Sequence, residues 1–206
     1  MIELYAVTNH PTAPLPEEVA PLRLVPCRDL AAVCAPAHEA EVSPEALWRH
    51  EEVVEALMRD RDLLPVRYGT RLLDEAAAAR AVADRRDELA AALQRVRGAV
   101  ELAVRVVPAG DAREDREPEA GGAAYMRARR AAADAASAIH GPLACRARAS
   151  AQRPSAVRPE LLRGAYLVDR AAVPRFRGAV AGLQREHPRL RILCTGPWPP
   201  YSFAET

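Results

Sequence analysis

The sequence of 206 residues contains no lysine, so arginine supplies all 29 of its basic side chains. The chain also carries 28 acidic residues, which leaves a formal net charge of +1. A protein that binds nucleic acid normally carries a basic excess on one face. The near balance argues against a nucleic-acid partner. We attribute the choice of arginine, together with the abundance of alanine, to GC-rich codon usage.

Long hydrophobic runs and paired cysteines are also missing. No stretch of 18 consecutive apolar residues is present, so we expect no membrane span. The first seven residues lack the basic region and apolar run of a signal peptide, which favours a cytoplasmic protein. The four cysteines show no CxxC spacing and are expected to be reduced thiols packed as small hydrophobes. They are Cys27, Cys34, Cys145 and Cys194.

Motifs for catalysis, cofactors and metals are scarce. His50 begins a segment that resembles a zinc-protease helix, but Val54 occupies the position of the second histidine, so we expect a surface histidine. No glycine-rich phosphate loop is present. A Cys–His pair such as Cys194 with His187 is an alternative to the simpler interpretation of a buried thiol and a surface histidine. We therefore expect no enzyme, no cofactor and no metal site.

The first half of the chain alternates short strands and helices. Ser43 supplies an N-cap and Pro44 a first helical residue for one helix. A short helical turn near residues 17–20 would complete the order of a ferredoxin-like split βαβ unit. A long helix is expected over residues 74–98. The expected strands are Ile2–Thr8, a hairpin of residues 22–27 and 30–35, and residues 63–68.

The second half predicts strands separated by loops and long helices. One helix begins near Ala123, and Gly141 with Pro142 should kink or interrupt it. Asp169 is expected to cap a second helix. The expected strands are residues 100–107, 164–168 and 190–195, and the expected loops are residues 108–122 and 150–160.

These patterns predict an α+β fold with two domains. Residues 1–98 form a ferredoxin-like domain, and residues 99–206 form a modified ferredoxin-like α+β domain with long helices and a C-terminal arm. A single larger sheet is the alternative.

One candidate contact site lies at the end of the strand near residue 68. Its residues are Arg67, Tyr68, Gly69 and Thr70, and the glycine permits a tight exit from the strand. Two interpretations stay open. The segment is either an ordinary corner with Arg67 in a structural ion pair, or a contact with a partner or between domains.

The C-terminal arm is the second candidate contact site. Its three prolines predict a stiff extended segment that neither continues a helix nor joins a central strand. It carries three of the nine aromatic residues, which favours docking over exposure. The arm packs on its own domain, binds a partner directly, or is a proline-rich ligand for an aromatic groove. The candidate residues are Gly196, Pro197, Trp198, Pro199, Pro200, Tyr201 and Phe203.

Several segments resemble the gas vesicle accessory proteins of the GvpF/GvpL family, in the order found in that family. They are LYAV at residues 4–7, WRHEEVVEALM at 48–58, LPVRYGT at 64–70, YLVD at 166–169 and LCTGPWPPYSF at 193–203. Tyr68 stands where the family often has phenylalanine. The resemblance covers essentially the whole chain and does not distinguish the GvpF paralogue from the GvpL paralogue.

The resemblance implies a non-catalytic assembly factor, chaperone-like or a minor structural component, located in the cytoplasm and at the gas vesicle. It also implies a two-domain α+β protein whose first domain binds the hydrophobic shell protein GvpA, with other gas vesicle accessory proteins as further candidate partners. We expect the terminal arm to lock the second domain or the domain interface. The alternative function is a small-molecule-sensing or enzymatic α+β protein with an unrecognised site.

Overall fold

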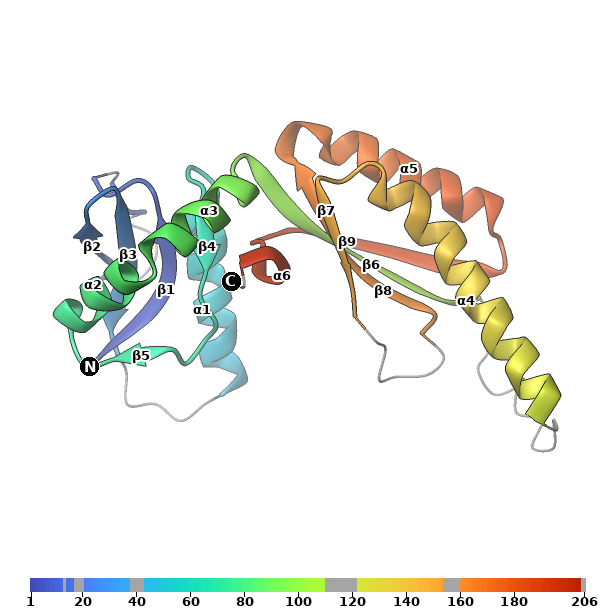
Figure 1. The fold of residues 1–206 in the computed structure, drawn as a ribbon, viewed down its shortest axis with the longest axis horizontal. Coiled ribbons are helices and arrows are strands. Elements are labelled where there is room, and N and C mark those ends of the chain that lie inside the picture. The colour runs from blue at the N-terminus through green and yellow to red at the C-terminus, as the bar shows by residue number, and fades with distance from the viewer. Residues whose placement is uncertain (13, 17–20, 38–42, 110–121, 154–159, 205–206) are drawn as a thin grey trace. The chain divides into compact units, whose positions relative to one another are not determined.

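The computed structural model describes residues 1–12, 14–16, 21–37, 43–109, 122–153 and 160–204. The chain divides into two units, one of Met1–Ala99 with Trp198–Thr206 and one of Val100–Pro197. Each unit has its own sheet and its own helices (Figure 1). The fold is therefore α+β with two sheets, as predicted, and the alternative of a single larger sheet is wrong.

The first unit holds a five-stranded sheet with the order β2-β3-β1-β4, in which β5 also pairs with β1. β1 is antiparallel to β3, β4 and β5. The central place of β1 between β3 and β4 is that of a split βαβ arrangement. The helical turn expected near residues 17–20 lies outside the described residues. The strands are β1 (Ile2–Thr8), β2 (Arg23–Cys27), β3 (Leu30–Pro36), β4 (Leu63–Pro65) and β5 (Arg71–Leu72).

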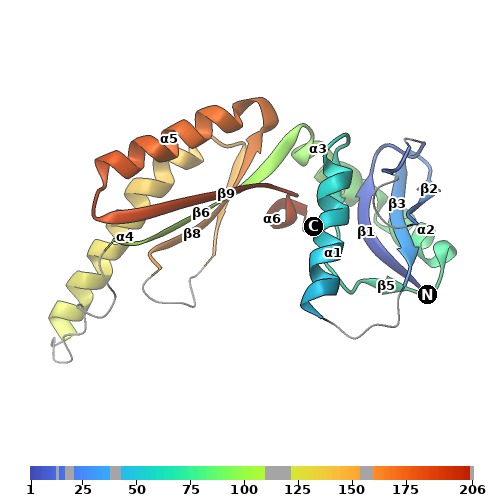
Figure 2. The same cartoon turned by 180° about the vertical axis from the view of Figure 1, so that it is seen from behind.

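Helices cover both faces of this sheet. Figure 1 shows α2 (Glu75–Asp84) and α3 (Arg86–Val96) on its near side, and Figure 2, from behind, shows α1 (Pro44–Met58) on the other. The predicted N-cap is confirmed, because the Ser43 hydroxyl accepts a hydrogen bond of 3.2 Å from the Ala46 amide. With both faces covered, all seven residues of β1 are buried. The polar residues of this strand therefore need internal partners.

The single long helix expected over residues 74–98 is wrong. It is two helices, α2 and α3, separated at Arg85, whose φ of −116° and ψ of 19° are not helical. The cause is packing: α2 contacts β2 and β3, whereas α3 contacts β4 and a short C-terminal helix. Each helix packs on different elements, and this packing outweighs the good helix propensity of the sequence.

The second unit holds a four-stranded sheet with the order β7-β8-β6-β9. Helices α4 and α5 join its strands in the order βαββαβ. The strand β7 replaces part of a predicted loop, and β7 pairs antiparallel with β8. The elements are β6 (Ala99–Pro108), α4 (Gly122–Ala144), β7 (Ala149–Gln152), β8 (Leu162–Asp169), the 3₁₀ turn η1 (Arg170–Ala172), α5 (Val173–Glu186) and β9 (Leu190–Trp198).

The core of the second unit joins α4 and α5 to one face of its sheet. Tyr166 of β8 and Phe176 of α5 are its largest members, with ring centroids 5.3 Å apart. Two helix predictions need correction. α4 continues through Gly141 and Pro142 to Ala144, so the predicted interruption is wrong, and the alternative of a kink there stays a prediction. Asp169 makes no capping hydrogen bond and instead pairs with Arg148.

Candidate functional site

The first predicted contact segment forms a tight corner between β4 and β5 in the first unit. β4 ends at Pro65, three residues before the predicted end. The amide and hydroxyl of Thr70 both donate to the Arg67 carbonyl, at 3.2 Å and 2.8 Å. Gly69 between them has a φ of +82°, which a glycine adopts without steric cost. The corner leaves the Arg67 side chain exposed and Tyr68 half-buried.

A buried polar pair lies beneath this corner. His50 of α1 is 2% exposed, so the expectation of a surface histidine is wrong. Its Nδ1 lies 3.2 Å from Oε1 of Glu3 on β1, and its Nε2 lies 2.9 Å from the Val66 carbonyl. The carbonyl can only accept, so Nε2 donates to it. The imidazole thereby connects α1 to β1 and to the backbone that leads into Arg67.

Two tyrosine rings enclose the same imidazole. Tyr5 stacks on it with a centroid distance of 4.7 Å, and Tyr68 meets it edge-on at 5.6 Å. Burial, assisted by the neighbouring Glu3 carboxylate, raises the pKa of Tyr5 to about 12. Tyr68 therefore has a packing role beside the exposed Arg67. Sequence reasoning missed this cluster because nothing in the spacing of Glu3 and His50 shows that they meet.

The second predicted contact segment divides between the two units. Gly196 and Pro197 belong to the end of β9 in the second unit, where Arg177 donates to the Gly196 carbonyl. The residues from Trp198 onward belong to the first unit. The assignment of the residues from Trp198 onward to the second domain is therefore wrong, and the alternative of a role at the domain interface stays a prediction.

The last described residues form a short helix, α6 (Tyr201–Ala204), rather than an extended arm. Pro199 and Pro200 before it are buried, and Phe203 is half-buried. α6 packs mainly on α3 and β4. Prolines favour the start of a helix because their φ is already helical and the first amides need no acceptor. The arm thus packs within the unit that contains the Arg67 corner.

A side-chain hydrogen bond fastens α6 to α1. The Tyr201 hydroxyl donates to Oε1 of Glu51 at 3.0 Å, across 150 positions of sequence. Burial is the main cause that raises the pKa of Tyr201 above its ordinary value, and the Glu51 carboxylate adds to it. Glu51 was not a predicted site residue, since a carboxylate on a helix is normally solvated.

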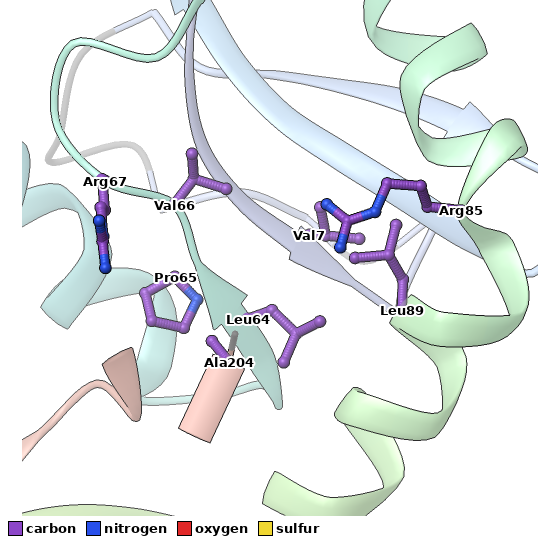
Figure 3. A pocket seen from close by; sticks show the side chains of 8 residues that line it. All are labelled: Val7, Leu64, Pro65, Val66, Arg67, Arg85, Leu89 and Ala204. Carbon is purple, nitrogen blue, oxygen red and sulfur yellow. The ribbon is translucent and has the colours of Figure 1, made fainter. Parts of the chain in front are cut away.

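The corner and the C-terminal helix line one hollow of about 450 Å³ in the first unit (Figure 3). Apolar side chains of β1, β4, α3 and α6 form most of its lining, and two arginines complete it. Of the predicted contact residues, Arg67 lines this hollow. The lining residues are Val7, Leu64, Pro65, Val66, Arg67, Arg85, Leu89 and Ala204. The sequence did not predict Arg85, because a break at that position was not expected.

The other candidate groups show little reactive character. Cys194 is half-buried against the core of the second unit, and burial raises the pKa of its thiol. Burial likewise raises the pKa of the Cys34 thiol. Within the described ranges, no group of three or more His, Cys, Asp or Glu could hold a metal ion. No helix in the described part of the chain has the length and apolar character of a membrane span.

Comparison with known proteins gives one consistent family. The model of the family described as "Gas vesicle synthesis protein GvpL/GvpF" matches residues 3–205. "Gas vesicle protein L" from Streptomyces sp. (strain CB03234) is 32% identical in an alignment of 245 positions, gaps included, that covers 98% of this chain and 91% of that protein.

Solved structures give the same result at the level of the fold. The crystal structure of GvpF from Microcystis aeruginosa matches with a TM-score of 0.84 and covers 100% of this chain and 99% of that one. The crystal structure of GvpF from Anabaena sp. PCC7120 matches with a TM-score of 0.86, over 100% of this chain and 96% of that one. Both are 18% identical to this chain, so they support the fold alone.

Proposed function

The chain belongs to the gas vesicle synthesis protein GvpL/GvpF family, and from this we propose that it is a non-catalytic assembly factor for the gas vesicle shell. Its proposed partner is the shell protein GvpA, with other gas vesicle accessory proteins as further partners. The family match over residues 3–205 is the observation that carries the proposal. The proposed location is the cytoplasm and the gas vesicle.

The physical reason for such a factor is the apolar character of a shell subunit. A protein with a large exposed apolar face aggregates unless that face is covered before assembly. An assembly factor needs a surface that binds the subunit reversibly and a fold that is stable without it. The first unit provides a central strand, β1, that is buried along its whole length, and a hollow whose floor is apolar.

We place the partner contact on the first unit, at the Arg67–Thr70 corner and the C-terminal residues that join this unit. The two segments have different roles in the proposal. Arg67 and Trp198 are exposed, Trp198 by 39%, and can contact a partner directly. Pro199 and Pro200 are buried and support the surface from within.

An aggregation assay tests the proposed function. The cognate shell protein is diluted from denaturant, and light scattering is followed with and without the full chain. We expect scattering to fall as the chain approaches one equivalent, and pull-down to recover the complex. If the chain neither binds the shell protein nor reduces its scattering, the proposal is wrong. Equal suppression with an unrelated aggregating protein would contradict a dedicated factor.

A small-molecule or enzymatic function is the alternative. It requires a ligand that stabilises the chain, because binding to the folded state raises the unfolding temperature. A thermal-shift screen of metabolites therefore separates the two proposals. A saturable shift with one metabolite, together with absent shell-protein binding, would favour the alternative.

A further inference from the structure

We propose that the free edge of β9 is a strand-pairing surface that fits a second copy of this chain, and that Gln184 and Arg177 of α5 hold it closed. β9 stands at one end of the order β7-β8-β6-β9, so β6 is its one neighbour among the described strands. Unpaired amides and carbonyls along such an edge are a template for pairing with another chain. The inference goes beyond the proposed function and does not depend on the shell protein.

β9 lacks the features that protect the other end strands of the two sheets. It has nine residues, and its proline, Pro197, is next to its last residue. By contrast, β2 has five residues and contains Pro26, β4 has three residues and ends at Pro65, and β7 has four residues. Short length and proline both hinder strand pairing, since proline has no amide hydrogen to donate. The part of β9 before Pro197 has neither feature.

Gln184 occupies the first part of the β9 edge with its side-chain amide. Its Nε2 donates to the Leu190 carbonyl at 2.7 Å, and its Oε1 accepts from the Ile192 amide at 2.8 Å. A primary amide combines a donor and an acceptor, as the backbone of a neighbouring strand does. The Gln184 side chain therefore takes the place of a residue of a pairing strand.

Arg177 closes the last part of the same edge. Its guanidinium donates to the Gly196 carbonyl. Arg177 and Gln184 are about two helical turns apart on α5, which runs alongside β9 (Figures 1 and 2). One helix thus supplies both side chains, one toward each end of the strand.

The backbone of β9 shows where the edge can pair. Successive residues of a strand direct their amides and carbonyls to alternate sides. The Arg189 carbonyl accepts from the Ala109 amide at the end of β6, whereas the backbone groups of Leu190 and Ile192 meet Gln184 on the other side. Cys194, two residues further, therefore presents its amide and carbonyl to the free edge, between the two closed stretches.

A second copy of β9 fits this edge in an antiparallel register centred on Leu193. Two identical edges can pair about a two-fold axis, since such a contact uses one self-complementary surface. Ile192 of each copy then pairs with Cys194 of the other, so both residues gain backbone partners. Leu193, which is 52% exposed, meets Leu193 of the second copy. A register centred on Arg191 would instead place two guanidinium groups opposite each other, which is unfavourable.

Removal of the two capping side chains from the full chain tests the inference. Arg177→Ala/Gln184→Ala opens the edge. Arg175→Ala/Arg185→Ala is the matched control, because it removes two exposed side chains of the same helix. Molar mass is measured by light scattering after size exclusion, with circular dichroism to check the fold. We expect the opened variant to form a species of twice the wild-type mass, and the control to keep the wild-type mass.

Leu193→Asp in the opened variant tests the register. It places two carboxylates opposite each other at the two-fold axis, so we expect the mass to return to that of wild type.

Hydrogen exchange of the wild-type chain tests the closed edge without any substitution. The Ile192 amide should exchange about tenfold more slowly than the Cys194 amide, because Gln184 accepts a hydrogen bond from Ile192. A Cys194 amide as well protected as that of Ile192 would mean that the wild-type edge is already paired, which contradicts the closed state.

The remaining outcomes each decide the inference. A folded opened variant that keeps the wild-type mass would overturn it, and so would a control whose mass also doubles. A dimer that persists after Leu193→Asp would show that another surface pairs. If the opened variant does not fold, the exchange measurement decides, and equal rates at Ile192 and Cys194 overturn the closed edge. None of these outcomes involves the shell protein, so the proposed function is tested separately.

Discussion

Replacing His50 by leucine should destabilise the first unit strongly. The imidazole is 2% exposed and lies 3.2 Å from the Glu3 carboxylate, whose side chain is 9% exposed. Leucine is similar in size, so the cavity that remains is small and the lost polar contacts determine the effect. The substitution leaves the Glu3 carboxylate buried without its partner.

The expected loss is about 1–3 kcal/mol, the typical cost of leaving one buried polar group without its hydrogen-bond partner. Loss of the hydrogen bond to the Val66 carbonyl acts in the same direction, by about 1–3 kcal/mol if that group stays dry. We take the lower sum, about 2 kcal/mol, because relaxation and water entry reduce both penalties. That is a large fraction of the ~5–15 kcal/mol that stabilises an ordinary domain.

Tryptophan fluorescence during urea unfolding provides a readout for this unit, with Trp48 on α1 as its main reporter. The chain has two tryptophans, Trp48 and Trp198, and both belong to the first unit. Glu3→Leu/His50→Leu is the control, because replacing both partners of a buried hydrogen bond by apolar groups costs little. We expect this double variant to recover most of the lost stability. A loss below about 1 kcal/mol for His50→Leu, or a double variant no better than the single one, would refute the buried-pair assignment.

Two further predictions concern glycines and a tyrosine. Gly164→Ala should destabilise the second unit by about 1–3 kcal/mol, because a Cβ there would lie 2.8 Å from the fully buried Tyr166 ring. Gly178→Ala on α5 should instead stabilise it by about 0.5–1 kcal/mol, because a Cβ there has nothing within 4 Å. Thermal unfolding of both variants checks this, and equal shifts in unfolding temperature would contradict it. The pKa of Tyr5 is raised from 10.0 to about 12, so its contribution to the free energy of unfolding is present below pH 10 and is lost as the pH rises through 12. The phenolate absorbance of Tyr5, taken as the difference between wild type and Tyr5→Phe, should appear near pH 12. Its appearance near pH 10 would contradict the burial of Tyr5.

Local signals in the sequence predicted most of the elements. β1 is confirmed at both bounds, and α1 begins at Pro44 after the Ser43 N-cap, as the capping rules require. The hairpin of β2 and β3 is also confirmed, with a two-residue turn at Arg28 and Asp29. These features depend on residues close in sequence, so a pattern of a few residues determines them.

Features that depend on distant residues were not predictable in the same way. The break at Arg85 reflects which strands α2 and α3 cover, and no helix-breaking residue marks it. The two-residue strand β5 is defined by its pairing with β1 and has little sequence signal of its own. His50 is polar in a mostly polar stretch, so its burial follows from the position of Glu3 in the fold and not from local hydrophobicity.

The candidate site shows the same division between local and distant information. Arg67 was predicted as a contact residue because a strand, an arginine and a glycine occur together at residues 63–69. Arg85 and Leu89 were not, since their place beside Arg67 depends on the angle between α3 and β4. The C-terminal aromatics Trp198, Tyr201 and Phe203 were assigned to the second domain, whereas they belong to the first unit. Sequence distance misled here: Tyr201 lies 150 positions from Glu51.

The hydrogen bond between Tyr201 and Glu51 determines how the two units can be studied separately. A fragment that ends at residue 98 is the obvious choice for the first unit, because the second unit begins at Val100. The first unit, however, also contains residues 198–206, and α6 contacts both α3 and β4. A fragment of residues 1–98 would lack Ala204 from the hollow and would leave Glu51 without the Tyr201 hydroxyl. Weak shell-protein binding by that fragment would therefore be ambiguous, whereas a chain in which residues 198–206 follow residue 98 through a flexible linker would test the unit in its complete form.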